Sequence, residues 1–98
     1  MSADLHILDS MATVTLRAPL KDLAGGHSDV RVEGATVGEV IRALEHEHPK
    51  LSGWILDEQG HVRLHVNVFV NGERVREDAA VHPADRLHVL PSISGGSQ

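Results

Sequence analysis

The chain has 98 residues, of which 41% are hydrophobic, and its formal net charge is −5. This length predicts one domain with one modest core, and the acidic balance argues against nucleic acid as a partner, because phosphate binding needs a basic surface. The absence of cysteine excludes disulfides and a thiolate nucleophile, and no apolar run reaches the roughly 18 residues of a membrane-spanning helix. We expect a cytoplasmic protein that has no membrane partner.

The N-terminal residues 1–10 are predicted to be an extension in front of a domain at residues 11–91. They contain no Lys or Arg, so they lack the basic region of a signal peptide. Two interpretations stay open: Met11 is the true start of translation, or the apolar side chains of the extension, Leu5, Ile7 and Leu8, dock on the fold.

Two segments near the N-terminus, residues 13–18 and 29–33, alternate apolar and polar side chains, as strands with one buried face do. The residues predicted to face inward are Val14, Leu16, Val30 and Val32. The intervening residues 19–28 contain Gly25-Gly26 and are predicted to form a loop.

A helix is predicted over residues 37–48. Thr36 and Glu39 have the Thr-x-x-Glu spacing of a capping box, in which each side chain bonds the backbone near the other. The next apolar residues recur with helical spacing and would form one buried stripe: Val37, Val40, Ile41 and Leu44. Pro49 ends the helix, because the residue before a proline avoids the helical conformation.

The second half of the chain is predicted to be mostly β-structure. Residues 50–60 would form a connection whose apolar side chains, Leu51, Trp54, Ile55 and Leu56, pack under the edge of the sheet. Residues 61–70 alternate strongly and predict a long strand with these residues inward: Val62, Leu64, Val66, Val68 and Val70.

The remaining segments complete a small sheet. Asn71-Gly72 is a tight-turn signal, and residues 73–82 are predicted to be a short strand or turn segment with Val75 inward. Residues 86–90 are the last predicted strand, with Leu87 and Val89 inward. This order predicts an α+β fold of the β-grasp (ubiquitin-like) type: a mixed sheet of four to five strands with one main helix across one face.

The C-terminal residues 92–98 are predicted to be a flexible tail that contains the pair Gly95-Gly96. Small side chains would let such a tail lie close against the backbone of another protein. The alternative is a flexible Gly/Ser end that has no function of its own.

The chain resembles the ThiS/MoaD family of ubiquitin-like sulfur carriers, on the segments 35–44, 66–76 and 85–96. The combination and spacing carry this resemblance, since Asn-Gly and Gly-Gly are each common. The segment Leu16-Arg17, the Gly25-Gly26 loop and the long strand are most similar to the carriers that serve cysteine biosynthesis in actinobacteria.

This resemblance implies a protein co-substrate and not an enzyme. An E1-like enzyme would use ATP to adenylate the carboxylate of Gly96, and a sulfur donor, either rhodanese-type or sulfide, would convert it to a thiocarboxylate. The carrier itself would bind no cofactor, and its tail residues Ile93, Ser94 and Gly95 would enter a narrow channel of the partner. A sulfur-accepting enzyme would then make cysteine, a cofactor or a specialised metabolite.

The sequence departs from the family pattern because Ser97-Gln98 follows the predicted reactive residue. We expect a zinc protease of the JAMM type to remove this dipeptide and expose Gly96; the alternative is a tail that has lost its role. Two other functions stay open, a ubiquitin-like modifier that forms isopeptide bonds through Gly96 and a passive β-grasp interaction module.

Strand parity places Phe69, His88 and Leu90 on the outer face of the predicted sheet, next to the tail. An exposed aromatic side chain among polar ones is a candidate anchor for a protein partner. The alternative is an isolated exposed apolar residue, which is ordinary on protein surfaces.

The eight histidines do not predict a metal site. His46 and His48 are two residues apart on a helix and do not face each other, and His61 and His65 on one strand would be about 13 Å apart. We also find no nucleophile next to a base and no phosphate-binding loop, so the sequence predicts no catalytic site.

Overall fold

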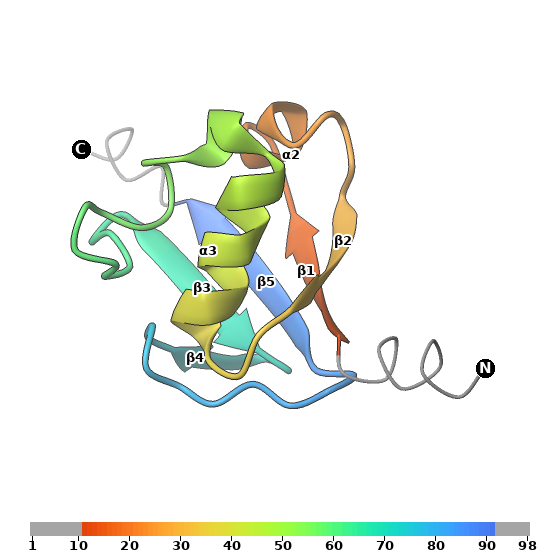
Figure 1. Ribbon diagram of the computed structural model, residues 1–98, viewed down its shortest axis with the longest axis vertical. Coiled ribbons are helices and arrows are strands. Elements are labelled where there is room, and N and C mark those ends of the chain that lie inside the picture. Colours follow the sequence, from red (N-terminus) through yellow and green to blue (C-terminus); the bar gives the residue numbers. More distant parts are fainter. Residues whose placement is uncertain (1–10, 92–98) are drawn as a thin grey trace.

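The computed structural model describes residues 11–91, which form a five-stranded sheet with one long helix across one face (Figure 1). The elements in chain order are β1 (Met11–Leu16), α2 (Leu20–Leu23), β2 (Asp29–Glu33), α3 (Val37–Glu47), the 3₁₀ turn η1 (Pro49–Leu51), β3 (Val66–Val70), β4 (Glu73–Val75) and β5 (Arg86–Pro91). The β-grasp prediction is thereby confirmed.

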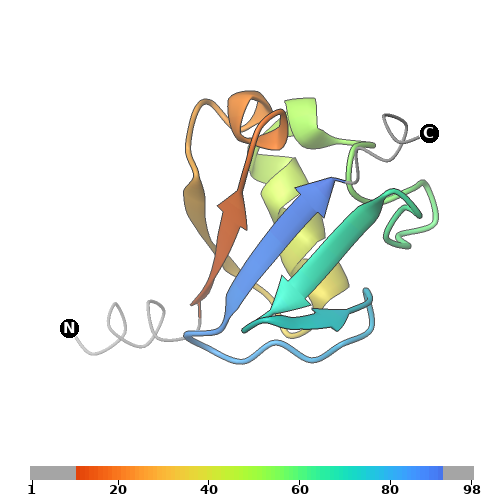
Figure 2. The same ribbon diagram turned by 180° about the vertical axis from the view of Figure 1, so that it is seen from behind.

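The last strand, β5, lies in the middle of the sheet, whose order is β2-β1-β5-β3-β4 (Figure 2). β5 is parallel to β1 and antiparallel to β3, and the outer pairs β1–β2 and β3–β4 are antiparallel. Strand neighbours on both sides therefore fix the path of β5 as far as Val89, and β3 alone continues the pairing to Pro91, the last residue that the structure describes.

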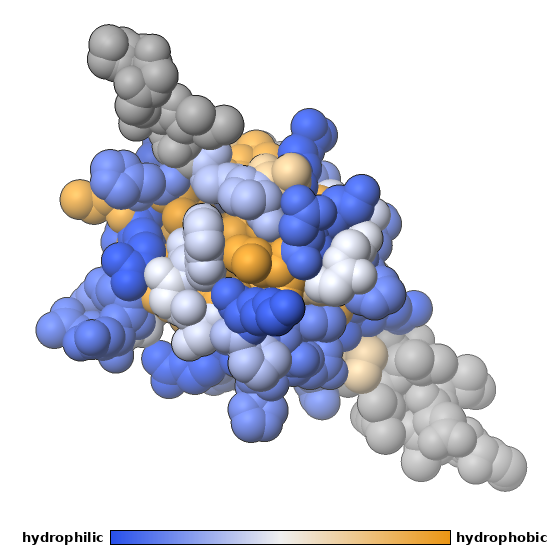
Figure 3. Space-filling view, turned by 90° about the horizontal axis from the view of Figure 1, so that it is seen from above, coloured by the Kyte–Doolittle hydropathy of each residue, from blue (hydrophilic) through white to orange (hydrophobic). Residues whose placement is uncertain are grey.

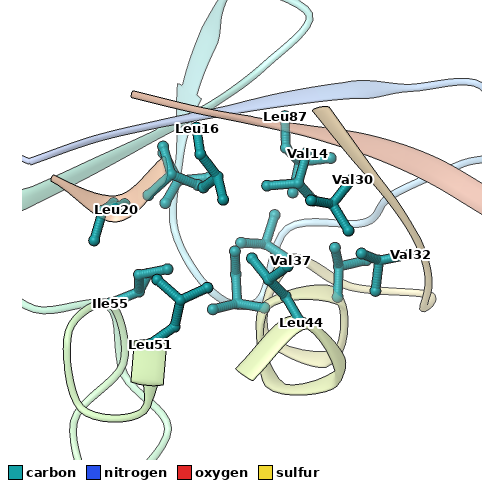
Figure 4. Close-up of a cluster of buried hydrophobic side chains, with 14 of the residues drawn as sticks. Val14, Leu16, Leu20, Val30, Val32, Val37, Leu44, Leu51, Ile55 and Leu87 are labelled. Carbon is teal, nitrogen blue, oxygen red and sulfur yellow. The ribbon is translucent and has the colours of Figure 1, made fainter. Parts of the chain in front are cut away.

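The core lies between the inner face of the sheet and α3, as Figure 4 shows. The apolar stripe predicted for the helix is completely buried, and the inward residues predicted for β1, β2 and β5 are buried with it. Burial of a Val or Leu side chain contributes about 1.5–3 kcal/mol, so the apolar face of α3 is the main attachment of the helix to the sheet.

The predicted capping box forms, but one of its two hydrogen bonds comes from the residue before the one expected. Thr36 Oγ1 accepts a hydrogen bond from the backbone N–H of Glu39 at 3.2 Å, while Glu39 Oε1 accepts one from Ala35, the residue before the cap, at 2.9 Å. The helix α3 starts at the predicted residue and ends at Glu47, one residue earlier than predicted.

The predicted loop at residues 19–28 contains a short helix, α2, which the glycine-rich composition did not indicate. This turn places Leu20 and Ala24 in the core. The strand β1 occupies residues 11–16 and not 13–18, because Met11 pairs with Glu33 at the start of the strand and Leu16 donates a hydrogen bond to Ser28 at its end.

The long strand predicted over residues 61–70 is wrong in its first half, because β3 begins only at Val66. The partner strand β5 ends at Pro91, directly opposite Val66. Residues 61–63 instead fold back on residues 55–57. As a result Leu64, predicted to be inward, is 88% exposed, and Trp54, predicted to lie under the sheet edge, is 47% exposed.

Residues 73–82 contain only the short strand β4, and the partly buried Val75 lies against the core as predicted. Val81, which the sequence pattern did not single out, is buried, and its N–H donates to the carbonyl of Ala35 at 2.9 Å. This contact fixes the β4–β5 connection beside the start of α3.

Candidate functional site

The outer face of the sheet brings together the residues that strand parity had selected. Phe69 of β3 lies directly opposite His88 of β5, and Leu90 of β5 lies opposite Asn67 of β3. Their neighbours Val68 and Val89 are buried on the opposite, helix-covered face, so these side chains point away from α3. We refer to Phe69, His88 and Leu90 as the outer patch.

The aromatic ring of the outer patch lies in a row of polar neighbours that crosses four strands. His88 faces Thr15 of β1 in the parallel pair, and Phe69 faces Arg74 of β4 in the antiparallel pair. The outer-face prediction implied exposed side chains, but Phe69 and His88 are half-buried. The reason is that each has a cross-strand neighbour on both sides. An aromatic side chain between an imidazole and a guanidinium suits a protein interface with a polar rim.

A polar network limits the outer patch on the side away from the chain end. Arg86 Nη1 donates to Thr15 Oγ1 at 2.8 Å and lies 3.5 Å from Asp29 Oδ1. The Thr15 hydroxyl donates in turn to Asp29 Oδ1 at 2.9 Å. The Arg86 and Asp29 side chains are about half exposed, so their ion pair contributes little to stability and mainly keeps this end of the face polar.

The opposite side of the outer patch ends at Pro91, which directly follows Leu90 and is the last described residue. The predicted reactive residue Gly96 and the predicted tail residues Ile93, Ser94 and Gly95 lie outside the described residues. The structure thus positions the root of the tail and the face beside it.

Carboxylates fix the loops that surround this face. Asp85 accepts hydrogen bonds from the backbone of His82 at 2.8 Å and from the Asn71 amide at 2.9 Å, and these bonds lower the pKa of its carboxyl. Glu77 accepts from the backbone N–H of Val62 at 2.9 Å, which lowers its pKa in the same way.

Two further carboxylates hold residues 55–63. Asp57 accepts hydrogen bonds from the backbone of His61 and Gln59, which lower its pKa. Glu45 of α3 accepts from the N–H of Leu56 at 3.4 Å, but partial burial outweighs this bond and raises the pKa of its carboxyl.

A groove of about 1030 Å³ lies between β2 and α3, on the helix side of the sheet. Sequence reasoning did not anticipate it, because it arises from the separation of two elements and not from any motif. Its walls mix both signs of charge, with Glu39, Arg42 and Glu47 on α3. This mixture of charges favours no particular class of ligand.

Other site types receive no support from residues 11–91. Within this range no three His, Asp or Glu side chains are close enough together to hold a metal ion. The rings of His27 and His48 have their centroids 6.3 Å apart and are tilted relative to each other. No helix in the described part of the chain has the length and apolar character needed to cross a membrane.

Comparison with known proteins identifies the relatives of this chain. The sequence model of the ThiS family matches residues 14–96. Small archaeal modifier protein 1 of Haloferax volcanii is 37% identical over 83 residues, which cover 83% of this chain and 95% of that protein. Sulfur carrier protein CysO of Mycobacterium tuberculosis is 33% identical over 90 residues, with 86% and 97% covered.

Solved structures agree with these relatives. A chain in the crystal structure of the Amycolatopsis orientalis BexX/CysO complex has a TM-score of 0.79 and 32% identity, with 87% of this chain and 99% of that chain covered. The crystal structure of small archaeal modifier protein 1 from H. volcanii has a TM-score of 0.78 and 35% identity, with 88% and 99% covered. The relatives are small carrier and modifier proteins and not enzymes, and this chain belongs to the ThiS family of ubiquitin-like proteins.

Proposed function

We propose that this protein carries sulfur as a thiocarboxylate on Gly96, after removal of Ser97-Gln98. The observation that carries the proposal is that the family match ends at Gly96 itself. In addition, β5 leads the chain from the middle of the sheet to Pro91, five residues before that glycine. The body of the protein serves as a handle for partners, and the tail supplies the reacting group.

The chemistry needs an activating partner, because a carboxylate is a poor electrophile. One oxygen of the Gly96 carboxylate attacks the α-phosphorus of ATP in an E1-like enzyme, and pyrophosphate leaves. Hydrosulfide then attacks the acyl carbon and displaces AMP, which leaves a thiocarboxylate and releases one proton. A rhodanese-type protein is the alternative sulfur donor. ATP is therefore a substrate of the partner, and the carrier holds no cofactor.

Removal of Ser97-Gln98 precedes this activation, because Gly96 has no free carboxylate while its carbonyl carbon is bonded to the nitrogen of Ser97. Hydrolysis of this bond consumes one water molecule and frees the carboxylate. A zinc protease of the JAMM type fits the reaction. Intact-mass measurement of the protein from its native host tests this step: species that end at Gly96 are expected, and an exclusively full-length population contradicts the proposal.

The outer patch is the surface that we assign to the activating enzyme. Phe69 is its aromatic centre, His88 lies opposite, and Leu90 connects it to the root of the tail. An enzyme that receives the tail must approach the end of β5, so docking on this face and insertion of the tail occur together. The relatives named as sulfur carriers, CysO, support a sulfur-accepting biosynthetic enzyme as the later partner, with cysteine as one candidate product.

A second candidate function is protein modification, which the two relatives named small archaeal modifier proteins favour. In that case the adenylated Gly96 is attacked by a lysine amine, and an isopeptide bond forms as AMP leaves. One experiment separates the functions. Protein ending at Gly96 is incubated with the E1-like enzyme, ATP and sulfide, and the masses of the products are measured by mass spectrometry.

A mass gain equal to the exchange of one oxygen for sulfur supports the carrier. Adducts linked through lysine support the modifier. Neither product, in the presence of an enzyme that is active on another carrier, refutes both functions and leaves a passive interaction module.

A further inference from the structure

The segment between η1 and β3 forms a small hairpin that the sheet does not include. Asp57 donates its N–H to the carbonyl of His61, and Arg63 donates to the carbonyl of Ile55, both at 2.9 Å. Between these two bonds, the backbones of Leu56 and Val62 pair as an isolated β-bridge. The side chains of both residues are buried in the core. The hairpin is thus fixed to the domain by its inner face.

Side-chain carboxylates hold both arms of the hairpin from outside. Glu45 of α3 binds the N–H of Leu56, and Glu77 of the β4–β5 connection binds the N–H of Val62. The Glu77 bond is the shorter of the two, at 2.9 Å, and charged hydrogen bonds of this kind are stronger than neutral ones. The open end of the hairpin therefore has a defined position relative to α3 and the sheet.

This open end carries the two large apolar side chains that the described residues expose. Trp54 follows η1 and is 47% exposed, and Leu64 precedes β3 and is 88% exposed. The bond from Arg63 to Ile55 brings their neighbours together, so Trp54 and Leu64 lie at the same end of the hairpin. Figure 3, which views the molecule from the end where α2 lies, shows apolar surface between hydrophilic side chains.

The open end of the hairpin lies next to the root of the tail. Leu64 is two residues before Val66, and Val66 pairs with Pro91. Two residues of extended chain plus one interstrand spacing place the Leu64 backbone within about 12 Å of Pro91. From Pro91, the five residues to Gly96 reach at most about 18 Å when fully extended. An enzyme that reacts with Gly96 must therefore come within about 18 Å of Pro91, at the edge of the sheet that also carries Leu64.

We propose that Trp54 and Leu64 form a second docking surface, which the adenylating enzyme contacts through an apolar patch beside the mouth of its tail channel. This inference rests on the proposed sulfur-carrier function. Apolar side chains on a backbone that is held in place lose less entropy on binding than side chains on a flexible loop. Aromatic residues of this kind contribute a large share of binding energy at protein interfaces. The outer patch and the hairpin thus contact the enzyme on two sides of the tail.

The test is ATP–pyrophosphate exchange by the E1-like enzyme of the same organism, with carrier ending at Gly96 as the varied substrate. We expect Leu64→Ser to raise the KM for the carrier about tenfold and to leave kcat unchanged, since it removes only docking contacts. Leu64 is almost fully exposed, so the variant folds. The matched control is His65→Ser, which changes the next exposed residue without removing apolar surface and keeps KM at its original value.

A second measurement uses Trp54, the one tryptophan of the chain. Protein labelled with 5-fluorotryptophan gives a single ¹⁹F resonance, which is expected to shift when the adenylating enzyme is added. An unchanged resonance together with an unchanged KM for Leu64→Ser overturns the second docking surface and leaves the carrier function intact. No exchange activity with the unaltered carrier refutes both.

Self-association is the remaining alternative occupant. Sedimentation velocity of the free carrier is expected to show the same species for the original protein and for Leu64→Ser. A dimer that this substitution dissociates would assign the surface to a second copy of the chain and overturn the proposal.

Discussion

Adjacent residues of β3 provide a direct test of the two faces of the sheet. Val68 is 1% exposed and points toward α3, whereas Phe69 is half-buried on the outer face. We compare Phe69→Asp with Val68→Asp, because both introduce the same charge into the same strand. Only the face of the sheet differs between the two variants.

The expected magnitudes follow from the neighbours of each side chain. Phe69 loses cross-strand contacts with His88 and Arg74, and such pairs contribute about 0.2–1 kcal/mol each. The new carboxylate remains hydrated on the outer face, beside the Arg74 guanidinium. We therefore expect the free energy of unfolding to fall by about 1 kcal/mol. Val68→Asp places an unpaired charge in the core and costs at least about 4 kcal/mol.

Urea unfolding measured by circular dichroism gives the two free energies. Phe69→Asp should remain folded while its affinity for the adenylating enzyme falls at least about tenfold, as expected for the aromatic centre of an interface. A loss of stability for Phe69→Asp close to that for Val68→Asp would show that the ring belongs to the core. Normal stability with unchanged affinity would remove the outer patch from the proposed interface.

Other predictions concern the helix cap, a close backbone contact and pH. Thr36→Ala should lower the free energy of unfolding by about 1 kcal/mol in urea titrations, whereas Thr36→Ser keeps the capping oxygen and most of the stability. Gly34→Ala should cost about 1–3 kcal/mol, because its Cβ would lie 2.8 Å from the backbone N of Val40; an unchanged urea midpoint contradicts this contact. Stability should also fall as the pH is lowered from about 5 to 3, and Asp85→Asn should reduce this slope.

The sign of the pH effect follows from the direction of each shift. The carboxyls of Asp57, Glu77 and Asp85 have folded-state pKa values below their ordinary ones. Their contribution is present above the unfolded pKa and is lost as the pH falls through the folded pKa. Glu45 has a raised pKa, so its contribution decreases as the pH rises from the unfolded to the folded pKa. Because three carboxyl pKa values are lowered and one is raised, we expect acid to reduce the free energy of unfolding.

Sequence periodicity predicted the parts of the fold in which one physical cause dominates. The helix stripe from Val37 to Leu44 and the alternation in β2 and β5 both reflect burial of one face, and the structure buries the predicted residues. The outer patch was predicted for the same reason, since knowing the buried face fixes the exposed one. The cross-strand neighbours of the patch could not be predicted, because they depend on the strand register, which a single sequence does not contain.

The errors arise where a local pattern depends on a distant partner. His61 to Val70 alternates throughout, yet only the part opposite β5 becomes a strand of the sheet. Within the first part Val62 is buried by the hairpin and Leu64 is not. Alternation shows which residues could share a face, but it does not show whether a neighbouring strand is present to complete that face.

The pairing of Pro91 with Val66 brings together two features that the sequence presents separately. Pro91 is the residue from which the chain continues toward Gly96. Residues 61–63, which precede β3, pair with residues 55–57, and Leu64 between this hairpin and β3 is exposed. The same edge of the sheet therefore holds both the root of the tail and an exposed apolar side chain. A partner adapted to the tail meets both features in the same place.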